Sequence, residues 1–158
     1  MSNRMPVTAR STSLPYDGAP VGAPHSAKAC ATVLLVEDDE QVLKLVSQAL
    51  STLGHLVVEA GDAVSALTAV YTDPTIDWLF SDVVLPHGMN GVQLAREARA
   101  VRPGLRTLLT SARSRAEVRA MGEIPYDVTF IPKPYMMTDI NAMLRWGARK
   151  TWPRDGRM

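Results

Sequence analysis

The feature that most constrains the fold is a regular alternation between short, unbroken apolar runs and longer segments with a helical stripe of apolar residues. A short apolar run without polar interruption is typical of a strand that is buried on both faces of a sheet. The runs predict strands at residues 32–36, 56–59, 76–81, 105–110 and 128–131. The stripes and caps predict helices at residues 40–53, from Asp62 to before Pro74, from Val92 to before Pro103, after Ser114, and at 138–149. Five strands that alternate with five helices predict an α/β fold, a doubly wound, five-stranded parallel sheet with helices on both faces.

The length and composition predict how the domain is bounded. A chain of 158 residues is typical of one domain with tails. Residues 1–30 are rich in Pro, Ser, Thr, Ala and Gly and lack an apolar period, which predicts a disordered head. The domain itself is expected at residues 31–148, and a basic tail is expected at residues 149–158.

The sequence contains no pattern typical of an export signal or a membrane anchor. No run approaches the roughly 20 apolar residues of a membrane span, and no apolar segment follows Arg4 and Arg10 near the N-terminus. The single cysteine, Cys30, excludes an internal disulfide, which suits a reducing compartment. We therefore expect a cytoplasmic protein that does not bind membranes.

The chain has a net charge of +1, but its charges are unevenly distributed. Residues 31–144 hold nine basic and 14 acidic side chains, a net charge of −5, whereas residues 145–158 hold five basic side chains and one acid. A basic tail of this kind could contact nucleic acid or anionic lipid. Because its charges are spread out and the segment is short, we interpret it as a solvated tail and expect no nucleic-acid partner.

Polar side chains follow four of the five predicted strands. In an open α/β sheet, ligands bind beyond the carboxyl ends of the strands, near the point where the strand order reverses. The first strand is followed by Glu37, Asp38, Asp39 and Glu40, the third by Asp82, the fourth by Ser111, and the fifth by Lys133 and Pro134. Carboxylates, a hydroxyl and a lysine are therefore expected to converge at one edge of the sheet.

These residue types favour a magnesium site that handles a phosphate. Clustered carboxylates raise one another's pKa unless a cation neutralises them, and Mg²⁺ suits a site with few protein ligands, several waters and a phosphate. Acidic residues are also common at a helix N-terminus, where they complement the helix dipole, and Asp39 and Glu40 fit that interpretation. It does not account for the whole set, because Asp82, Ser111 and Lys133 follow three other strands.

Four segments resemble the signature segments of response-regulator receiver domains, in the same order and at the same spacing. They are VLLVEDDE, FSDVVLPHGMNG, LLTSA and FIPKP, and the resemblance covers about residues 31–148. Their amino-acid sequences are most similar to those of stand-alone receivers and of receivers attached to hybrid histidine kinases. The resemblance implies a flavodoxin-like (βα)5 fold and a role in two-component phosphorelay signalling.

The resemblance also implies roles for individual residues at the metal site. Asp82 matches the phosphoacceptor and is itself a metal ligand. Asp38 and Glu37 match the acidic pair that holds Mg²⁺, Asp38 directly and Glu37 through water. The backbone carbonyl of Val84 matches a further metal ligand.

The remaining assignments concern phosphoryl binding and the conformational switch. Ser111 matches the hydroxyl that bonds the phosphoryl oxygen, and Lys133 matches the lysine that pairs with the phosphate. The Lys133–Pro134 bond is implied to be cis, an isomer found in about 5–6% of X-Pro bonds. Phe130 matches the aromatic switch position, so Ser111, Phe130 and Pro134 are expected to form the switch.

A receiver of this kind accepts a phosphoryl group from a histidine kinase or a histidine phosphotransfer protein and then changes its binding to a downstream protein. Residues 149–158 are too few for an output domain, so none is expected. The expected chemistry is limited to self-phosphorylation and autodephosphorylation, and the protein is not expected to be an enzyme with external substrates.

Two alternatives remain open. The first is a receiver-shaped binding module that is never phosphorylated, although the intact set of Asp38, Asp82, Ser111 and Lys133 argues against it. The second is a Mg²⁺-dependent phosphatase with Asp82 as nucleophile. Such enzymes usually need a second carboxylate two residues further on, where this chain has Val84.

Overall fold

The computed structural model describes residues 31–147. The predicted head at residues 1–30, the predicted tail at 149–158 and the last part of the predicted final helix lie outside the described residues. Among the described residues, no helix is both long enough and apolar enough to cross a bilayer.

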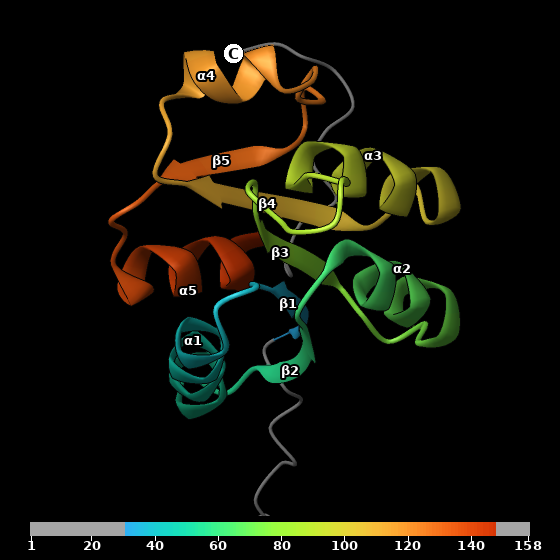
Figure 1. The fold of residues 1–158 in the computed structure, drawn as a ribbon. Coiled ribbons are helices and arrows are strands. Elements are labelled where there is room, and N and C mark those ends of the chain that lie inside the picture. The colour runs from blue at the N-terminus through green and yellow to red at the C-terminus, as the bar shows by residue number, and fades with distance from the viewer. Residues whose placement is uncertain (1–30, 148–158) are drawn as a thin grey trace, which may run out of the picture.

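Five strands form one parallel sheet with the spatial order β2-β1-β3-β4-β5 (Figure 1). They are β1 (Thr32–Val36), β2 (Leu56–Ala60), β3 (Trp78–Asp82), β4 (Arg106–Ser111) and β5 (Thr129–Pro132). The order reverses at β1, because β2 pairs with one of its edges and β3 with the other. This arrangement confirms the predicted doubly wound α/β fold and places the reversal between the ends of β1 and β3.

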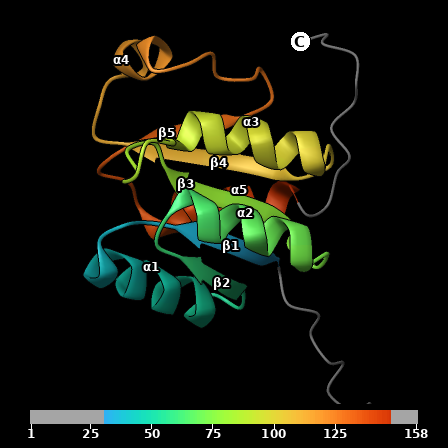
Figure 2. The ribbon, with the colours of Figure 1, turned by 45° about the vertical axis from the view of Figure 1, so that its right-hand side comes forward.

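Helices cover both faces of the sheet, as Figures 1 and 2 show. They are α1 (Glu40–Thr52), α2 (Ala63–Thr72), α3 (Gly91–Val101), α4 (Arg115–Ala120) and α5 (Met137–Gly147). One hydrophobic core lies between the sheet and α2, α3 and α4, and a second lies between the sheet and α1 and α5. All five residues of β1 are buried, because both cores cover this central strand, which explains its unbroken apolar run.

Each of the first four helices begins at a side chain that accepts a hydrogen bond from the backbone of its first turn. Asp39, Asp62, Asn90 and Ser114 are these N-caps. Ser114 caps α4 as predicted, and Glu117 returns the contact in a capping box. These caps fix where the chain leaves the sheet after β1, β2, β3 and β4.

The structure differs from the predicted strand ends by one residue at the functional edge. Asp82 and Ser111 are the last residues of β3 and β4, not the first residues after them. The cause is backbone pairing, which continues through polar side chains: Asp82 pairs with Thr110 and Ser111 with Pro132. Asp82 and Ser111 are therefore held by the sheet ladder.

Candidate functional site

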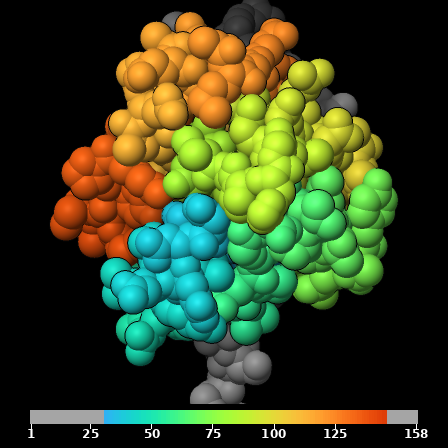
Figure 3. All heavy atoms as spheres, viewed as in Figure 1, coloured from blue at the N-terminus to red at the C-terminus, as the bar shows by residue number. Residues whose placement is uncertain are grey.

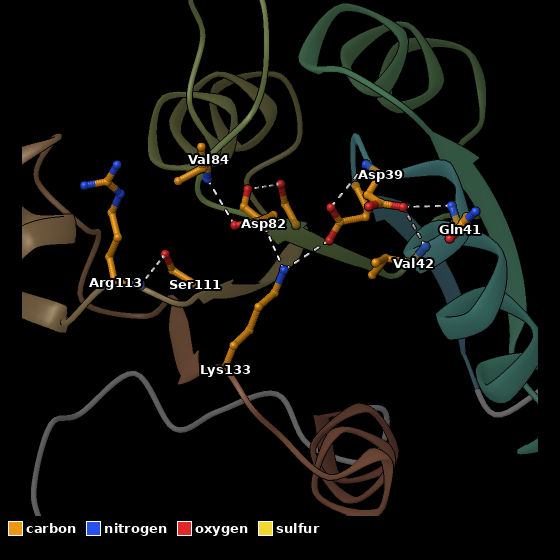
Figure 4. A network of polar contacts seen from close by, with 10 residues as sticks. Asp39, Gln41, Val42, Asp82, Val84, Ser111, Arg113 and Lys133 are labelled. Carbon is orange, nitrogen blue, oxygen red and sulfur yellow. Dashed lines mark hydrogen bonds and ion pairs between the residues drawn. The ribbon is translucent and has the colours of Figure 1, made fainter.

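The carboxyl ends of β1, β3 and β5 bring Glu37, Asp82 and Lys133 into contact. Lys133 Nζ lies 2.7 Å from Asp82 Oδ2 and 3.2 Å from Glu37 Oε2, so one ammonium donates to two carboxylates (Figure 4). The Glu37 and Asp82 side chains are only 9% and 13% exposed. Buried charges persist where they are paired and hydrogen-bonded. Three of the residues expected to converge therefore do so.

Charge and burial have opposite effects on the pKa values of this group. Burial raises the pKa of Glu37 above its ordinary value of 4.5, and Lys133 offsets this only in part. Burial lowers the pKa of Lys133, but the hydrogen bonds and charges of Asp82 and Glu37 outweigh it and raise that pKa above 10.5. Pairing outweighs burial for the pKa of Lys133, which contacts two carboxylates, but not for the pKa of Glu37, which shares the ammonium with Asp82. Lys133 is therefore cationic at neutral pH.

The Asp82 carboxylate is oriented by contacts at both oxygens. Oδ1 accepts a hydrogen bond of 3.0 Å from the backbone N–H of Val84, and Oδ2 accepts the bond from Lys133. The hydroxyl of Ser81 donates to the Asp82 carbonyl at 2.7 Å. In the space-filling view, the segment after β1 (cyan) and the loop after β3 (yellow-green) lie next to each other on the face toward the viewer (Figure 3).

The backbone of Gly91 packs closely against the backbone of Asp82, a role that the sequence did not predict. It is the first residue of α3, and its N–H donates to the Val83 carbonyl at 2.8 Å. A Cβ at this position would lie 2.1 Å from the Asp82 carbonyl oxygen, so only glycine allows this approach. The available signal was a glycine directly after the cap Asn90, but a sequence does not reveal what backbone lies opposite.

Ser111 and Phe130, two of the three predicted switch residues, lie on neighbouring strands. Ser111 is 1% exposed, and its hydroxyl oxygen accepts from the Arg113 N–H at 3.1 Å (Figure 4). Its carbonyl accepts from the Lys133 N–H at 2.8 Å, which ties the end of β5 to β4. Phe130 is half-buried and packs against the core beneath α2, α3 and α4. The Lys133–Pro134 bond is cis, as the resemblance implied.

The acidic run after β1 separates into side chains with different surroundings. Glu37 is buried and contacts Lys133, whereas Asp38 is exposed. Asp39 caps α1, accepting from Gln41 N–H at 2.9 Å and Val42 N–H at 3.1 Å, which agrees with its interpretation as a helix-dipole residue.

The donor chemistry of this edge fits Mg²⁺. Asp82 and Glu37 provide two hard carboxylates that share one ammonium, Asp38 follows Glu37 in the chain and is exposed, and the Val84 carbonyl lies in the loop after β3. Within residues 31–147, no three His, Cys, Asp or Glu side chains form a preformed metal cage. Mg²⁺ keeps several waters and uses one or two protein carboxylates with a phosphate, so it does not require such a cage.

Comparisons with known proteins identify the family. Residues 33–145 match the family model of the response regulator receiver domain. The chain belongs to this family. The match covers the sheet except for Thr32, and it includes the edge that carries Glu37, Asp82, Ser111 and Lys133, so the resemblance drawn from the four sequence segments is confirmed.

Curated relatives of this receiver domain are longer proteins. Response regulator MprA of Mycobacterium avium (strain 104) is 31% identical over 123 residues, which cover 78% of this chain and 53% of that protein. Probable transcriptional regulatory protein TcrX of Mycobacterium tuberculosis (strain ATCC 25618 / H37Rv) is 32% identical over 120 residues, 76% of this chain and 50% of the relative. The chain thus spans about half the length of the curated relatives that it matches.

Solved structures share the receiver fold. A response regulator receiver protein from Sinorhizobium medicae WSM419 superimposes with a TM-score of 0.67 at 22% identity, over 75% of this chain and 94% of that one. The receiver domain of the hybrid histidine kinase CckA superimposes with a TM-score of 0.62 at 28% identity, over 75% of this chain and all of that one (100%).

Proposed function

We propose that this receiver domain accepts a phosphoryl group on Asp82, in a Mg²⁺-dependent reaction, from a histidine kinase or a histidine phosphotransfer protein. The observation that carries the proposal is the contact of 2.7 Å between Lys133 Nζ and Asp82 Oδ2, with Glu37 on the same ammonium. A carboxylate is a suitable nucleophile for an acyl-phosphate intermediate, and an adjacent fixed cation stabilises the charge of the transferred group.

The proposed transfer needs positioning and charge neutralisation more than acid–base chemistry. An Asp82 carboxylate oxygen attacks phosphorus, and the bond from phosphorus to the histidine nitrogen breaks, leaving its electron pair on the imidazole. Lys133 then pairs with a phosphoryl oxygen. Asp38, Glu37, Asp82 and the Val84 carbonyl are the groups proposed to hold Mg²⁺, which supplies positive charge against the phosphoryl oxygens when it is bound.

Phosphorylation is proposed to act on partners through Ser111 and Phe130. The Ser111 hydroxyl turns from the Arg113 N–H to donate to the phosphoryl group, and the Phe130 ring turns inward toward the space that Ser111 leaves. One new hydrogen bond and one added charge thereby shift the equilibrium between two packings of β4, α4 and β5. Phe130 has no hydroxyl that would hold it in an outward position, and α4 has only six residues, which supports a mobile segment.

The proposed output is altered binding to a downstream protein in the cytoplasm. Residues 31–144 carry a net charge of −5, which disfavours contact with a nucleic-acid backbone by the receiver itself. The names of the relatives MprA and TcrX describe a response regulator and a probable transcriptional regulatory protein, so regulation is the shared context.

The test is incubation of the full chain with acetyl phosphate and Mg²⁺, followed by intact mass measurement. We expect one phosphoryl adduct that decays slowly and does not form in excess chelator. No adduct with Mg²⁺ present would support the unphosphorylated binding module instead. Rapid, continuing hydrolysis of phosphate esters would support the Mg²⁺-dependent phosphatase.

The switch has a separate test by amide hydrogen exchange with and without the adduct. We expect the largest changes at residues 111–135, which hold Ser111, α4 and Phe130, and little change in α1. Changes confined to the loop after Asp82 would contradict the switch while leaving phosphorylation intact.

A further inference from the structure

Tyr135 lies two residues after Lys133, where β5 leads into α5. Its half-buried ring packs against the core beneath α1 and α5 and meets Phe80 edge to face, with ring centroids 5.9 Å apart and an interplanar angle of 61°. Phe80 is 1% exposed, so the partner of this ring is fixed within the core. Aromatic rings in this geometry attract each other beyond the effect of simple burial.

Each ring belongs to a residue that lies two positions along the chain from a charged residue of the proposed site. Phe80 precedes Asp82 by two residues on β3, so both side chains point to the same face of the sheet. Tyr135 follows Lys133 by two residues. The contact between Phe80 and Tyr135 therefore joins the segment that carries the carboxylate to the segment that carries the ammonium.

The backbone does not make this connection by itself. β4 lies between β3 and β5 in the sheet, so Lys133 is tied by its N–H to Ser111 of β4 and reaches Asp82 only through its side chain. A lysine stem has several rotatable bonds, and its reach depends on where its base is held. The ring of Tyr135 holds that base against β3 directly.

The phenol contributes no charge to the site. Burial raises the pKa of Tyr135 above 10, and Glu37 and Asp82 act in the same direction against the opposing effect of Lys133. The hydroxyl is therefore neutral at physiological pH. Any contribution of Tyr135 to the site therefore comes from the position of its ring and not from a charge.

We propose that Tyr135 is a positioning residue for phosphoryl acceptance, whose ring contact with Phe80 sets where the Lys133 ammonium sits relative to Asp82. The inference rests on the proposed function, because it concerns the rate at which Asp82 is labelled. It predicts that the ring matters, that the hydroxyl does not, and that the effect passes through Lys133.

The experiment measures the rate of labelling by acetyl phosphate with Mg²⁺ in the full chain. Tyr135→Phe is expected to label within about twofold of the parent, and Tyr135→Leu roughly tenfold more slowly, because misplacing a catalytic cation lowers the rate. In a Lys133→Met background, Tyr135→Leu is expected to cause no further loss. A purely structural role would instead multiply the two effects.

Val46→Ala is the matched control, because Val46 is a buried residue of the same core on α1. It is expected to lower the free energy of unfolding without slowing the labelling. The inference is overturned if Tyr135→Leu labels at the parent rate, if Tyr135→Phe is as slow as Tyr135→Leu, or if the losses multiply in the Lys133→Met background. A parent chain that takes no label would overturn the proposed function and this inference together.

Discussion

The two ends of the sheet carry the same kinds of charged side chain in different arrangements. At the amino end, Asp77 Oδ2 accepts the backbone N–H of Thr32 at 2.9 Å, and the Arg106 guanidinium lies 5.0 Å from the centre of the Trp78 ring. Arg102 donates to the carbonyls of Val70, Ile76 and Asp73, which joins the end of α2 to the start of β3. Asp77 and Arg102 thus bind backbone groups, although Arg106 also pairs with Asp77 at 3.9 Å.

At the carboxyl end, the charged groups bind mainly to one another. Lys133 pairs with Asp82 and Glu37, and Asp38, the residue after Glu37, is exposed. Charges that satisfy backbone groups stabilise the fold and are not available for other partners. Charges that pair with one another can exchange a partner for an incoming phosphate or cation. The comparison teaches that the partner of a strand-end charge, more than its residue type, indicates whether it is structural or reactive.

The largest expected effect comes from replacing one aspartate at each end of β3. Asp82→Asn is expected to reduce labelling by acetyl phosphate at least about a hundredfold, because an amide is not a nucleophile for phosphorus. Asp77→Asn is the matched control and keeps an oxygen acceptor for Thr32. It is expected to label normally. Equal labelling of both variants, measured by intact mass, would contradict the comparison.

The second prediction concerns the arginine that binds backbone. Arg102→Met removes the donors to three carbonyls and is expected to lower the free energy of unfolding by about 3 kcal/mol, because buried acceptors lose charged hydrogen bonds. The folded protein is expected to label at the parent rate. Urea unfolding and the labelling assay measure the two effects.

Arg99→Met is the control for this prediction. Arg99 pairs with the carboxylate of Asp127, which is 40% exposed, so its loss is expected to cost within about 1 kcal/mol. If Arg102→Met were no more destabilising than Arg99→Met, the structural role of the amino end would be wrong.

The third prediction concerns Gly91, where backbone packing supports the reactive end. Gly91→Ala places a Cβ 2.1 Å from the Asp82 carbonyl oxygen, so the start of α3 or the end of β3 must shift. We expect a loss of about 2 kcal/mol in the free energy of unfolding, the range for strained overpacking, together with slower labelling. Gly61→Ala, where a Cβ meets no atom within 4 Å, is the control. Equal free energies of unfolding and equal labelling rates for the two variants would contradict the role that we assign to Gly91.

The smallest expected effect is a pH dependence at Glu37. Because its pKa is raised in the folded protein, ionised Glu37 disfavours folding at neutral pH, and this penalty fades as the pH falls through the unfolded value of 4.5. In metal-free buffer, Glu37→Gln is therefore expected to be slightly more stable than the parent near neutral pH. The difference is expected to disappear below about pH 4. A variant that is less stable than the parent near neutral pH would show that the pairing with Lys133 outweighs burial.

Local patterns predicted the elements and the convergence of three charged residues at one edge, for identifiable reasons. The apolar runs predicted the strands because β1, β3 and β4 are covered on both faces, and the convergence of Glu37, Asp82 and Lys133 follows from parallel strands ending at one edge. The ends of β3 and β4 were each placed one residue early, because backbone pairing continues under polar side chains that a hydrophobic pattern excludes.

The features that could not be predicted depend on contacts between distant segments. The acidic run does not reveal that Glu37 turns inward while Asp38 stays exposed. The contact of Tyr135 with Phe80 depends on how the sheet and its connections pack in space. The three carbonyl partners of Arg102 likewise belong to α2 and to the connection between α2 and β3.

The most direct test of the central claim is to map which carboxylate carries the phosphoryl group. Borohydride reduces an acyl phosphate of aspartate to homoserine, so tandem mass spectrometry of the treated and digested protein identifies the labelled position. We predict homoserine at position 82 only in samples that received both acetyl phosphate and Mg²⁺. Reduction products at Glu37, Asp38 or Asp77 with none at position 82 would contradict the claim that the charges at the carboxyl end of β3 form the phosphoryl acceptor.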